Sequence, residues 1–563
     1  MSYESLEGAV QTLVTTNSAL VAAVTGTQQE ATDAITKAEQ SAIKAKESEV
    51  FSGQLLTQTE AHADRSQAKS VESEASAARS KASEVASAAS AATAAAVVTG
   101  GTASLSPEAG KIPLSDGEGK IDVNWLGADV AARIMMASPQ INDIGVPGTV
   151  GFGVGICPLE YPDMAPLAGT FTKGPEYGNY QYKDGSIIPW VPAYFYRYGH
   201  PDNPTYATYG VNSIHVLPRS AYPTILAAAI AGYALHRAFW DDGVEQPGFF
   251  FDKYLCSNNN GTASSIKDGN AMTTSGAHFP IAGLTGSVPN NFSGAILAAK
   301  TRGEDFFPST TFIFDALAKL SLAHAQASTS SAVCAWYDES GVSNFPKGCN
   351  NNALGDAQDS TVYYESTGHE TYDKAGKTGS GMPFAKTTHN GQACGIADLN
   401  GLLWEVNLGL TILDGVYYIL DKEVRIADLT PGLTLETDAW GPAGVAKNYI
   451  ELGATFESLG TESDRAIGSA GQVFSSDTEG LGWSAAGAGI PLADGMGGTN
   501  LFGNDRLYDT NKPEHMCIAA GGNWHHSVTA GVWARHCNYS RSYSSSTCGC
   551  RSALYLVKRS DSE

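Results

Sequence analysis

Basic side chains are scarce in this sequence of 563 residues. Its 35 Lys and Arg stand against 58 Asp and Glu, which gives a formal net charge of −23 at pH 7. Proteins that bind nucleic acids through the phosphates need a basic face that releases counterions. We therefore expect no nucleic-acid partner.

Long apolar runs and a secretory signal are also missing. No stretch approaches about 18 consecutive apolar residues, and the start MSYESLEGAV lacks the basic, then apolar, pattern of a signal peptide. We expect a chain that is made and folded in a cytoplasm. Nine scattered cysteines, an odd number, exclude a complete set of internal disulfides. Cys548 and Cys550 have no second pair at zinc-ligand spacing, so we expect no metal there.

Composition divides the chain, which is longer than one hydrophobic core usually supports. Residues 1 to about 100 are dominated by Ala, Ser, Thr, Glu and Lys with almost no aromatics, whereas the remainder is rich in Gly, Tyr, Trp, Phe and Asn. We predict a stalk over residues 1–99, a neck over 100–139 and a compact head over 140–563.

The stalk carries the apolar spacing of a coiled coil, in which steps of four and three residues alternate. This seam is formed first by Leu6, Val10, Leu13, Asn17, Leu20 and Val24, and later by Ala75, Ala78, Ala82, Val85, Ala89, Ala92 and Ala96. A buried polar residue such as Asn17 fixes register and chain number. The spacing leaves a dimer or a trimer open. A disordered Ala/Ser linker is the alternative, because Gly26 and the weak seam near Gly53 could interrupt the helix.

The neck is rich in helix-breaking Gly, Pro and Ser over residues 100–127, which predicts short extended pieces. Its segments 111–113, 119–122 and 125–126 resemble a short segment that phage tail fibres carry between stalk and tip.

The sequence of the head predicts short strands with many turns. Two amphipathic helices are expected, from Tyr222 to Phe239 and from Thr311 to Ala325, packed on a small irregular sheet as an α+β domain with long loops. His236, within the first of them, has no Ser, Cys or Asp partner by motif, so a structural histidine is favoured over a catalytic base.

Residues 395–406, GIADLNGLLWEV, resemble a strand of the C-type lectin fold as found in formylglycine-generating enzymes and in diversified phage adhesins. Asn400 and Gly401 supply a turn, Trp404 enters the core, and a buried Glu405 needs hydrogen-bond partners that offset its desolvation. We interpret this segment as framework.

Residues 521–553, GGNWHHSVTAGVWARHCNYSRSYSSSTCGCRSA, resemble the variable region of retroelement-diversified phage proteins of the major tropism determinant type. With the preceding segment, the resemblance assigns scaffold roles to Asn400, Gly401, Trp404, Glu405, Gly521, Gly522, Trp524, Gly531, Arg541, Gly549 and Arg551. It assigns receptor binding to His525, His526, Ser527, Val528, Thr529, His536, Asn538, Tyr539, Tyr543, Ser545, Ser546 and Thr547. Adenine-directed mutagenesis of asparagine codons cannot produce Lys, Glu, Gln, Trp or Met, and none of these occurs at the binding positions.

The same stretch can be interpreted without the family. A run rich in Ser, Tyr, His, Asn and Thr cannot form a core, yet its Gly and Trp residues imply order. Tyr and His give large contact area at low entropic cost, and Ser and Asn give adaptable hydrogen bonding, as in paratopes. We therefore predict a rigid, exposed binding surface, with an ordinary polar loop as the alternative.

Together the resemblances imply an N-terminal α-helical coiled coil, a homotrimer, followed by an α+β C-type lectin-like domain of the formylglycine-generating-enzyme subtype. They imply a tail-fibre adhesin of the virion that binds a host bacterial surface receptor, protein or glycan, and joins other tail or baseplate proteins through its N-terminus. They imply neither a cofactor nor an enzymatic activity.

The sequence disfavours three other functions. An oxidase of the formylglycine-generating type needs two copper-binding cysteines. In this sequence the corresponding positions are His526 and Gly531, so the two thiolates are missing. A calcium-dependent sugar lectin needs E-P-N or Q-P-D triplets, which do not occur, although stacking could still bind sugar. A polysaccharide-cleaving fibre tip needs paired carboxylates, and the acidic residues form no recognisable pair.

Overall fold

The computed structural model divides into two compact units, Met1–Ala128 and Asp129–Glu563. It describes residues 7–21, 25–26, 37, 103–104, 112–113, 141–338, 345–429, 431, 448–459, 464–476, 489–491, 497–509 and 516–557.

The first unit is described over a few short segments. Residues 7–21 are helical, and Val10, Leu13 and Leu20 on this helix are between 54% and 71% exposed. In the neck, β1 (Ala103–Ser104) pairs in parallel with β2 (Ile112–Pro113), which are short extended pieces of the expected kind. The alanine seam at residues 75–96, together with Leu6 and Val24, lies outside the described residues.

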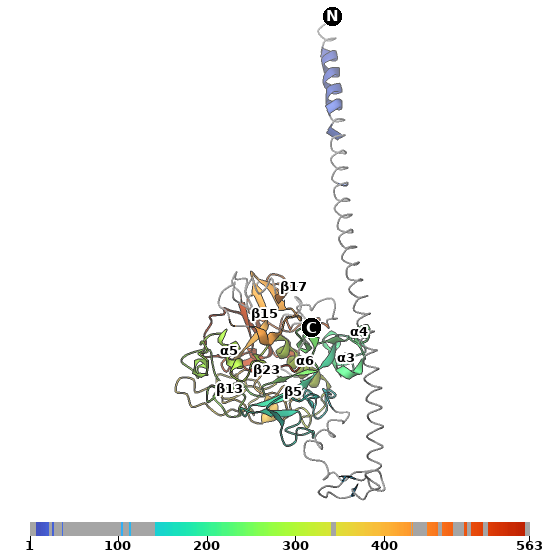
Figure 1. Cartoon of the computed structure of the whole chain (residues 1–563). Helices are drawn as coiled ribbons and strands as arrows, with labels where there is room; N and C mark the ends of the chain where they lie inside the picture. The colour runs from blue at the N-terminus through green and yellow to red at the C-terminus, as the bar shows by residue number, and fades with distance from the viewer. Residues whose placement is uncertain are drawn as a thin grey trace, which may run out of the picture. The chain divides into compact units, whose positions relative to one another are not determined.

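The second unit is mostly β in its described part and contains two large sheets (Figure 1). The first sheet has the order β14 (Phe306–Pro308), β23 (Ser552–Leu554), β11 (Gly248–Phe251), β5 (Ile187–Pro192), β4 (Asn179–Tyr182), β3 (Met164–Pro166). The second has the order β17 (Tyr449–Thr455), β16 (Val416–Leu420), β15 (Trp404–Leu413), β20 (Met516–Gly521), β21 (Gly531–Tyr539), β19 (Arg506–Tyr508), β18 (Asp464–Ala466), with β22 (Cys548–Gly549) beside β15.

Smaller elements complete this unit. A third sheet has the order β7 (Ile214–Pro218), β6 (Tyr194–Tyr198), β8 (Ala234–Leu235). Two strand pairs join β9 (Trp240–Asp241) to β10 (Val244–Glu245) and β12 (Ser257–Asn259) to β13 (Thr262–Ser264). The short helices are α3 (Tyr206–Tyr209), α4 (Ile225–Ile230) and α5 (Gly294–Lys300).

The long helix α6 (Thr311–Ala327) packs on β15, β20 and β21 of the second sheet and is buried from its first residue to Gln326. Its start is fixed by Thr310, whose side chain accepts a hydrogen bond from the backbone N–H of Ile313 at 3.1 Å. A helix buried all round must be apolar all round, and this one largely is. In β15, Gly409 has a φ of +87°, and a Cβ there would lie 2.5 Å from the Phe312 ring, so helix and sheet approach closely only because of this glycine.

The two expected helices had different outcomes. The helix expected at Thr311 to Ala325 is confirmed and ends two residues later. The one expected from Tyr222 to Phe239 is wrong for most of its length, because α4 ends at Ile230 and Gly232 follows with a φ of +78°. Beyond it, Leu235 pairs with Phe195 of β6. His236 is buried, and its Nε2 lies 2.9 Å from Asp315.

A buried ion pair connects the two large sheets. Arg551 lies between β22 of the second sheet and β23 of the first, and its Nη2 and Nε donate to the two carboxylate oxygens of Glu405 at 2.8 and 3.0 Å. The same guanidinium also donates to the backbone carbonyls of Asp252 and Ala397, each at 2.9 Å. Both side chains are buried, so Glu405 has the hydrogen-bond partners that its burial requires.

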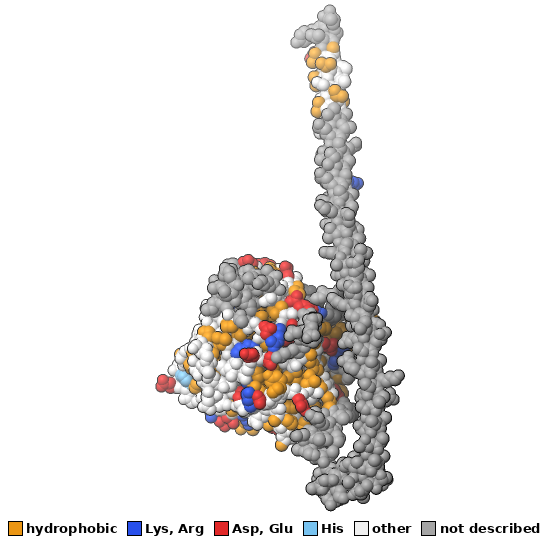
Figure 2. Space-filling model, viewed as in Figure 1, with side chains coloured by type: hydrophobic (Ala, Val, Ile, Leu, Met, Phe, Trp, Pro, Cys, Tyr) orange, Lys and Arg blue, Asp and Glu red, His pale blue; other side chains and the backbone are white. Residues whose placement is uncertain are grey.

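The surface is mixed in character. Figure 2 shows one face of the second unit, on which acidic and basic side chains lie near one another among apolar ones.

All nine cysteines are free and buried. In the described part of the chain, the helices fall short of the length or apolarity that crossing a membrane demands.

We predict that Arg551→Met lowers the free energy of unfolding by about 3 to 5 kcal/mol, because it leaves the Glu405 carboxylate buried without its partner. The double variant Glu405→Leu/Arg551→Met should recover much of this loss. Urea unfolding of the full chain, followed by tryptophan fluorescence, measures both.

The matched control is Lys183→Met, which breaks a 2.7 Å ion pair with Asp163 whose side chains are 59% and 48% exposed. This variant should lower the free energy of unfolding by less than about 1 kcal/mol. Equal losses for Arg551→Met and Lys183→Met would contradict a structural role for the buried pair.

Candidate binding surface

Residues 521–553 run from the last residue of β20 through β21 and β22 into the start of β23, with a loop before each of β21 and β22. The first loop begins with Gly521 and Gly522, whose φ values are +93° and +81°. A Cβ on Gly522 would lie 2.4 Å from the Cβ of Ala530, so the two ends of the loop touch. The loop is therefore closed tightly at its base, with the helical turn 527–529 inside it.

A bulge in β21 controls which side chains share a face. Cys517 of β20 pairs with Tyr539, whereas Ala519 pairs with His536, so three steps on β21 oppose two steps on β20. Side chains alternate along a regular strand, and the extra residue shifts that alternation by one. His536 and Tyr539 consequently stack at 3.8 Å between ring centroids.

Four rings form a continuous stack, which we call the aromatic row: Tyr508, His536, Tyr539 and Tyr543. Successive centroids are 5.2, 3.8 and 3.9 Å apart, and all three interplanar angles are 21° or less. Each stacked pair stabilises the arrangement by about 0.5 to 1.5 kcal/mol beyond area burial. The rings therefore hold one another in place.

Trp404 supports the row from below. It is fully buried, and its ring meets His526 and His536 edge-on at 5.1 and 5.3 Å. His525 lies further out, with its ring 4.9 Å from that of His526 and 4.9 Å from that of Trp524. We call the aromatic row together with Trp404, Trp524, His525 and His526 the array. Imidazole rings from both loop and strand thus share one indole platform.

The second loop, residues 540–547, is tied to neighbouring segments by its backbone. The carbonyl of Tyr543 accepts from the N–H of Phe292 at 2.8 Å, and the N–H of Ser545 donates to the Thr274 hydroxyl at 3.0 Å. The carbonyl of Ser546 lies 2.9 Å from Nδ1 of His278. Main-chain contacts therefore hold much of this loop, and two side chains add to them: the Ser544 hydroxyl donates to the Thr274 carbonyl, and the Ser545 hydroxyl accepts from the Thr547 N–H at 3.2 Å.

The predicted receptor-binding residues differ in exposure, and His525, His526, His536, Tyr539 and Tyr543 among them belong to the ring contacts. His525 is exposed, and the half-buried residues are His526, Ser527, Val528, Thr529, His536, Asn538, Tyr543, Ser545, Ser546 and Thr547. Tyr539 differs from the expectation of an exposed surface, because it is only 8% exposed. The β21 bulge places it between His536 and Tyr543, and its two flat faces are covered.

The predicted scaffold residues lie beneath or beside the aromatic row. Trp524 is half-buried, and the buried residues are Asn400, Gly401, Trp404, Glu405, Gly521, Gly522, Gly531, Arg541, Gly549 and Arg551. At Gly531 a Cβ would lie 2.1 Å from the Asp505 carboxylate, which accepts a hydrogen bond from the N–H of Trp533 at 2.8 Å. Burial raises the pKa of Asp505 to about 8.

Tyr508 is the member of the row that sequence reasoning missed. It lies on β19, where Leu507 and Tyr508 pair in parallel with Arg535 and His536 of β21. Its position falls outside the 521–553 motif, and the tripeptide Arg506–Tyr508 carries no recognisable pattern of its own. Only the strand pairing reveals it.

The array is electrically neutral. Burial lowers the pKa of His526 to about 4, and burial together with His526 lowers the pKa of His536 to about 3. Within the described residues, Nδ1 of both imidazoles and Nε1 of Trp404 are buried without a hydrogen-bond partner. Among those residues no cluster of three or more His, Cys, Asp or Glu is placed to hold a metal ion. The arrangement can stack with a ligand and hydrogen-bond to it without charge.

Comparisons with known proteins gave structural similarities alone. No protein-family model and no curated protein matches the chain. Among solved structures, it is similar to the Major Tropism Determinant U1 variant and M1 variant, each 11% identical, with TM-scores of 0.23 and 0.25. Each match covers 66% of this chain and 64% of the other, less than two thirds of that chain's length. These scores do not establish a shared fold.

The neutral imidazoles predict a pH dependence of stability. Below the ordinary histidine pKa of about 6.5, the unfolded chain binds protons that the native His536 does not. The stability that this residue contributes is therefore complete above pH about 6.5 and decreases as the pH falls toward its native pKa of about 3.

His536→Phe keeps a ring in the stack but cannot bind a proton. Between pH 7.5 and pH 5, we expect its free energy of unfolding to fall by about 1 to 2 kcal/mol less than that of the wild type. Urea unfolding at both pH values measures the difference. If the two proteins lost the same amount, His536 would not be held neutral by its surroundings.

Proposed function

We propose that the protein is a phage tail-fibre adhesin whose second unit, a C-type lectin-like head, binds a host-cell surface receptor through the aromatic row and its flanking loops. The observation that supports this proposal best is that the rings of His536, Tyr539 and Tyr543, together with Tyr508, stack into one surface. Aromatic side chains provide large amphipathic contact area at little entropic cost, which is how binding surfaces gain affinity.

The sequence resemblance of residues 521–553 supports the same function, and on that basis we propose that the binding positions are diversified by a retroelement. The chemistry of the site favours adhesion over catalysis. His526 and His536 are held neutral by burial, and a general base needs a pKa near the working pH. We accordingly propose that the protein is not an enzyme.

Tyr543 gives the sharpest test of the binding surface. We expect Tyr543→Ala to weaken attachment of the fluorescently labelled full chain to a bacterial strain that the wild type binds, by about tenfold. Its melting temperature should stay close to that of the wild type, since Tyr543 is half-buried at the end of the row. Flow cytometry over a concentration series measures attachment.

Tyr363→Ala is the matched control, because Tyr363 is 59% exposed and lies outside the row. It should attach as the wild type does. Unchanged attachment of Tyr543→Ala, or equal losses in the two variants, would refute the assignment of the binding surface to the row.

The N-terminal helix supports a further part of the proposal, a homotrimeric stalk that joins other tail proteins. Figure 2 shows apolar side chains on the surface of residues 7–21, and Val10, Leu13 and Leu20 among them occupy the predicted seam. Copies of the same helix would cover this seam. Three linked heads would then raise overall binding about 10²-fold or more without new contacts.

We expect light scattering at micromolar concentration to give three times the 58.9 kDa mass of one chain. Leu13→Asp, which charges the seam, should lower the measured mass, whereas Thr12→Asp, one residue away and off the seam, should not. A wild-type mass of 58.9 kDa would rule out the assembly.

A further inference from the structure

A groove with a volume of about 920 Å³ opens beside the β12–β13 hairpin. Four asparagines line it, Asn258, Asn259, Asn260 and Asn270, and Phe279 forms part of its apolar edge. Its volume lies within the range of small-ligand sites. The aromatic row contributes none of these residues.

The hairpin turn and its neighbours hold the amides of Asn258 and Asn259 in place. Asn260 and Gly261 have φ values of +52° and +89°, the pair of positive values that a type I′ turn requires. The side chain of Asn258 accepts from the Gly261 N–H at 2.8 Å and donates to the Gly283 carbonyl at 3.0 Å. Asn259 donates to the Asp184 carbonyl at 2.8 Å. These amides are therefore positioned before any ligand arrives.

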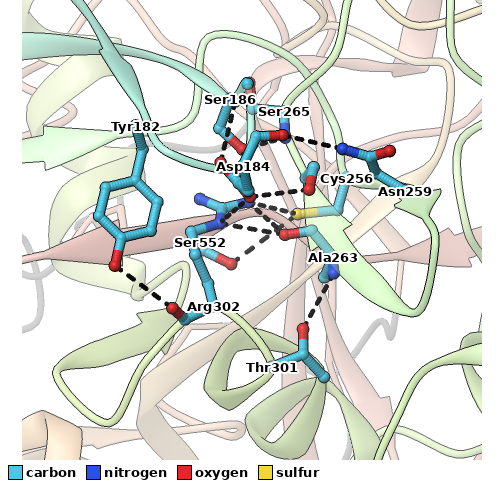
Figure 3. Close-up of polar contacts among 12 residues, drawn as sticks. Tyr182, Asp184, Ser186, Cys256, Asn259, Ala263, Ser265, Thr301, Arg302 and Ser552 are labelled. Atoms are coloured by element: carbon cyan, nitrogen blue, oxygen red, sulfur yellow. Dashed lines mark hydrogen bonds and ion pairs between the residues drawn. The ribbon is translucent and has the colours of Figure 1, made fainter. Parts of the chain in front are cut away.

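The one carboxylate in the wall, that of Asp184, is hydrogen-bonded from behind, and its buried partner Arg302 is shared with Asp252, to which Nη1 of Arg302 donates at 2.5 Å. Asp184 lies 3.2 Å from Nε of Arg302, which is itself fully buried. Its carboxylate also accepts hydrogen bonds from the hydroxyls of Ser186 and Ser264 at 2.8 and 2.7 Å. Figure 3 shows Asp184 and Arg302 at the centre of this network, with Asn259 beside them. The amides that line the groove are uncharged, and the Asp184 carboxylate is already engaged by Arg302 and the two hydroxyls.

Hydrogen-bonding capacity remains at the mouth. Asn270 is exposed, and its side chain makes no hydrogen bond within the described residues. Each amide offers two donors and an acceptor. Phe279 is half-buried with a φ of +42°, a conformation that costs free energy for a bulky residue and that concentrates at functional sites.

We propose that this groove binds a neutral saccharide. Adjacent hydroxyl groups on a sugar ring pair with the donor and acceptor of an amide, while the apolar C–H face of the ring packs on an aromatic edge such as Phe279. Uncharged amides match the hydroxyls of a neutral ligand, and the Asp184 carboxylate in the wall disfavours an anion. The site goes beyond the proposed receptor surface and exists whether or not the aromatic row binds a receptor.

The groove adjoins the segment 521–553, so a ligand in the groove would lie near the proposed receptor surface. His278, the neighbour of Phe279, lies 2.9 Å from the carbonyl of Ser546. A saccharide in the groove and a receptor on the row would be held by one continuous part of the head. Binding at two linked sites strengthens attachment without improving either site.

The test uses the full chain and saturation-transfer NMR with glucose, galactose, mannose, N-acetylglucosamine, lactose, cellobiose and chitobiose, followed by titration of any binder. At least one should bind. Asn270→Ala should weaken its binding about 3- to 10-fold, the effect of one lost hydrogen bond. Asn270→Trp, which fills the mouth, should abolish it. Both variants should keep the wild-type melting temperature, because Asn270 is exposed.

Two controls locate the effect. Asn351→Ala, at an exposed asparagine outside the groove, and Tyr543→Ala, in the aromatic row, should both bind the saccharide as the wild type does. The proposal is overturned if none of the saccharides binds, or if Asn270→Trp retains wild-type affinity. A loss that follows Tyr543→Ala instead would place the sugar on the aromatic row and overturn it equally.

Discussion

The second unit depends on one buried ion pair, between Glu405 and Arg551. The chain passes from the second sheet to the first between Gly549 and Ser552, and this crossing fixes where residues 540–547 must lie. Gly549 allows the crossing because a Cβ there would lie 2.7 Å from the Met272 carbonyl. The guanidinium then joins β15 to the backbone of Asp252 and Ala397. The ion pair adds a directional contact to apolar packing, which is not directional, and to the backbone hydrogen bond from the Leu408 N–H of β15 to the Ser309 carbonyl that follows β14.

The connection separates the residues that hold the frame from those of the proposed binding surface. Buried groups hold the frame, namely the ion pair, Trp404 and the glycines at the loop bases. Loops 523–530 and 540–547 are anchored largely through backbone hydrogen bonds, so their side chains can change without removing those anchors. Tyr539 is the exception, since it stacks on both sides and supports the row as well as belonging to it.

The sequence was most informative where a local pattern determines structure. The cap and apolar run of α6 predict that helix, and the burial of Glu405 demands a partner. The identity of that partner could not be predicted from the pattern around Glu405, because Arg551 is 146 residues away. The bulge in β21 was equally hidden, since strand register depends on the neighbouring strand. Tyr508 joined the site through that register, and the helix expected up to Phe239 failed because pairing with β6 outweighed helical periodicity.

We propose that a fixed frame carries a replaceable surface, and deep mutational scanning tests this most directly. A library of the full chain, substituted singly at all positions from 521 to 553 and sorted for protease resistance, would give the stability cost at each. We predict that most substitutions are tolerated at 525–529, 536, 538, 543 and 545–547, and that few are tolerated at Gly522, Gly531, Gly549 and Arg551. Equal intolerance in the two groups would contradict the account.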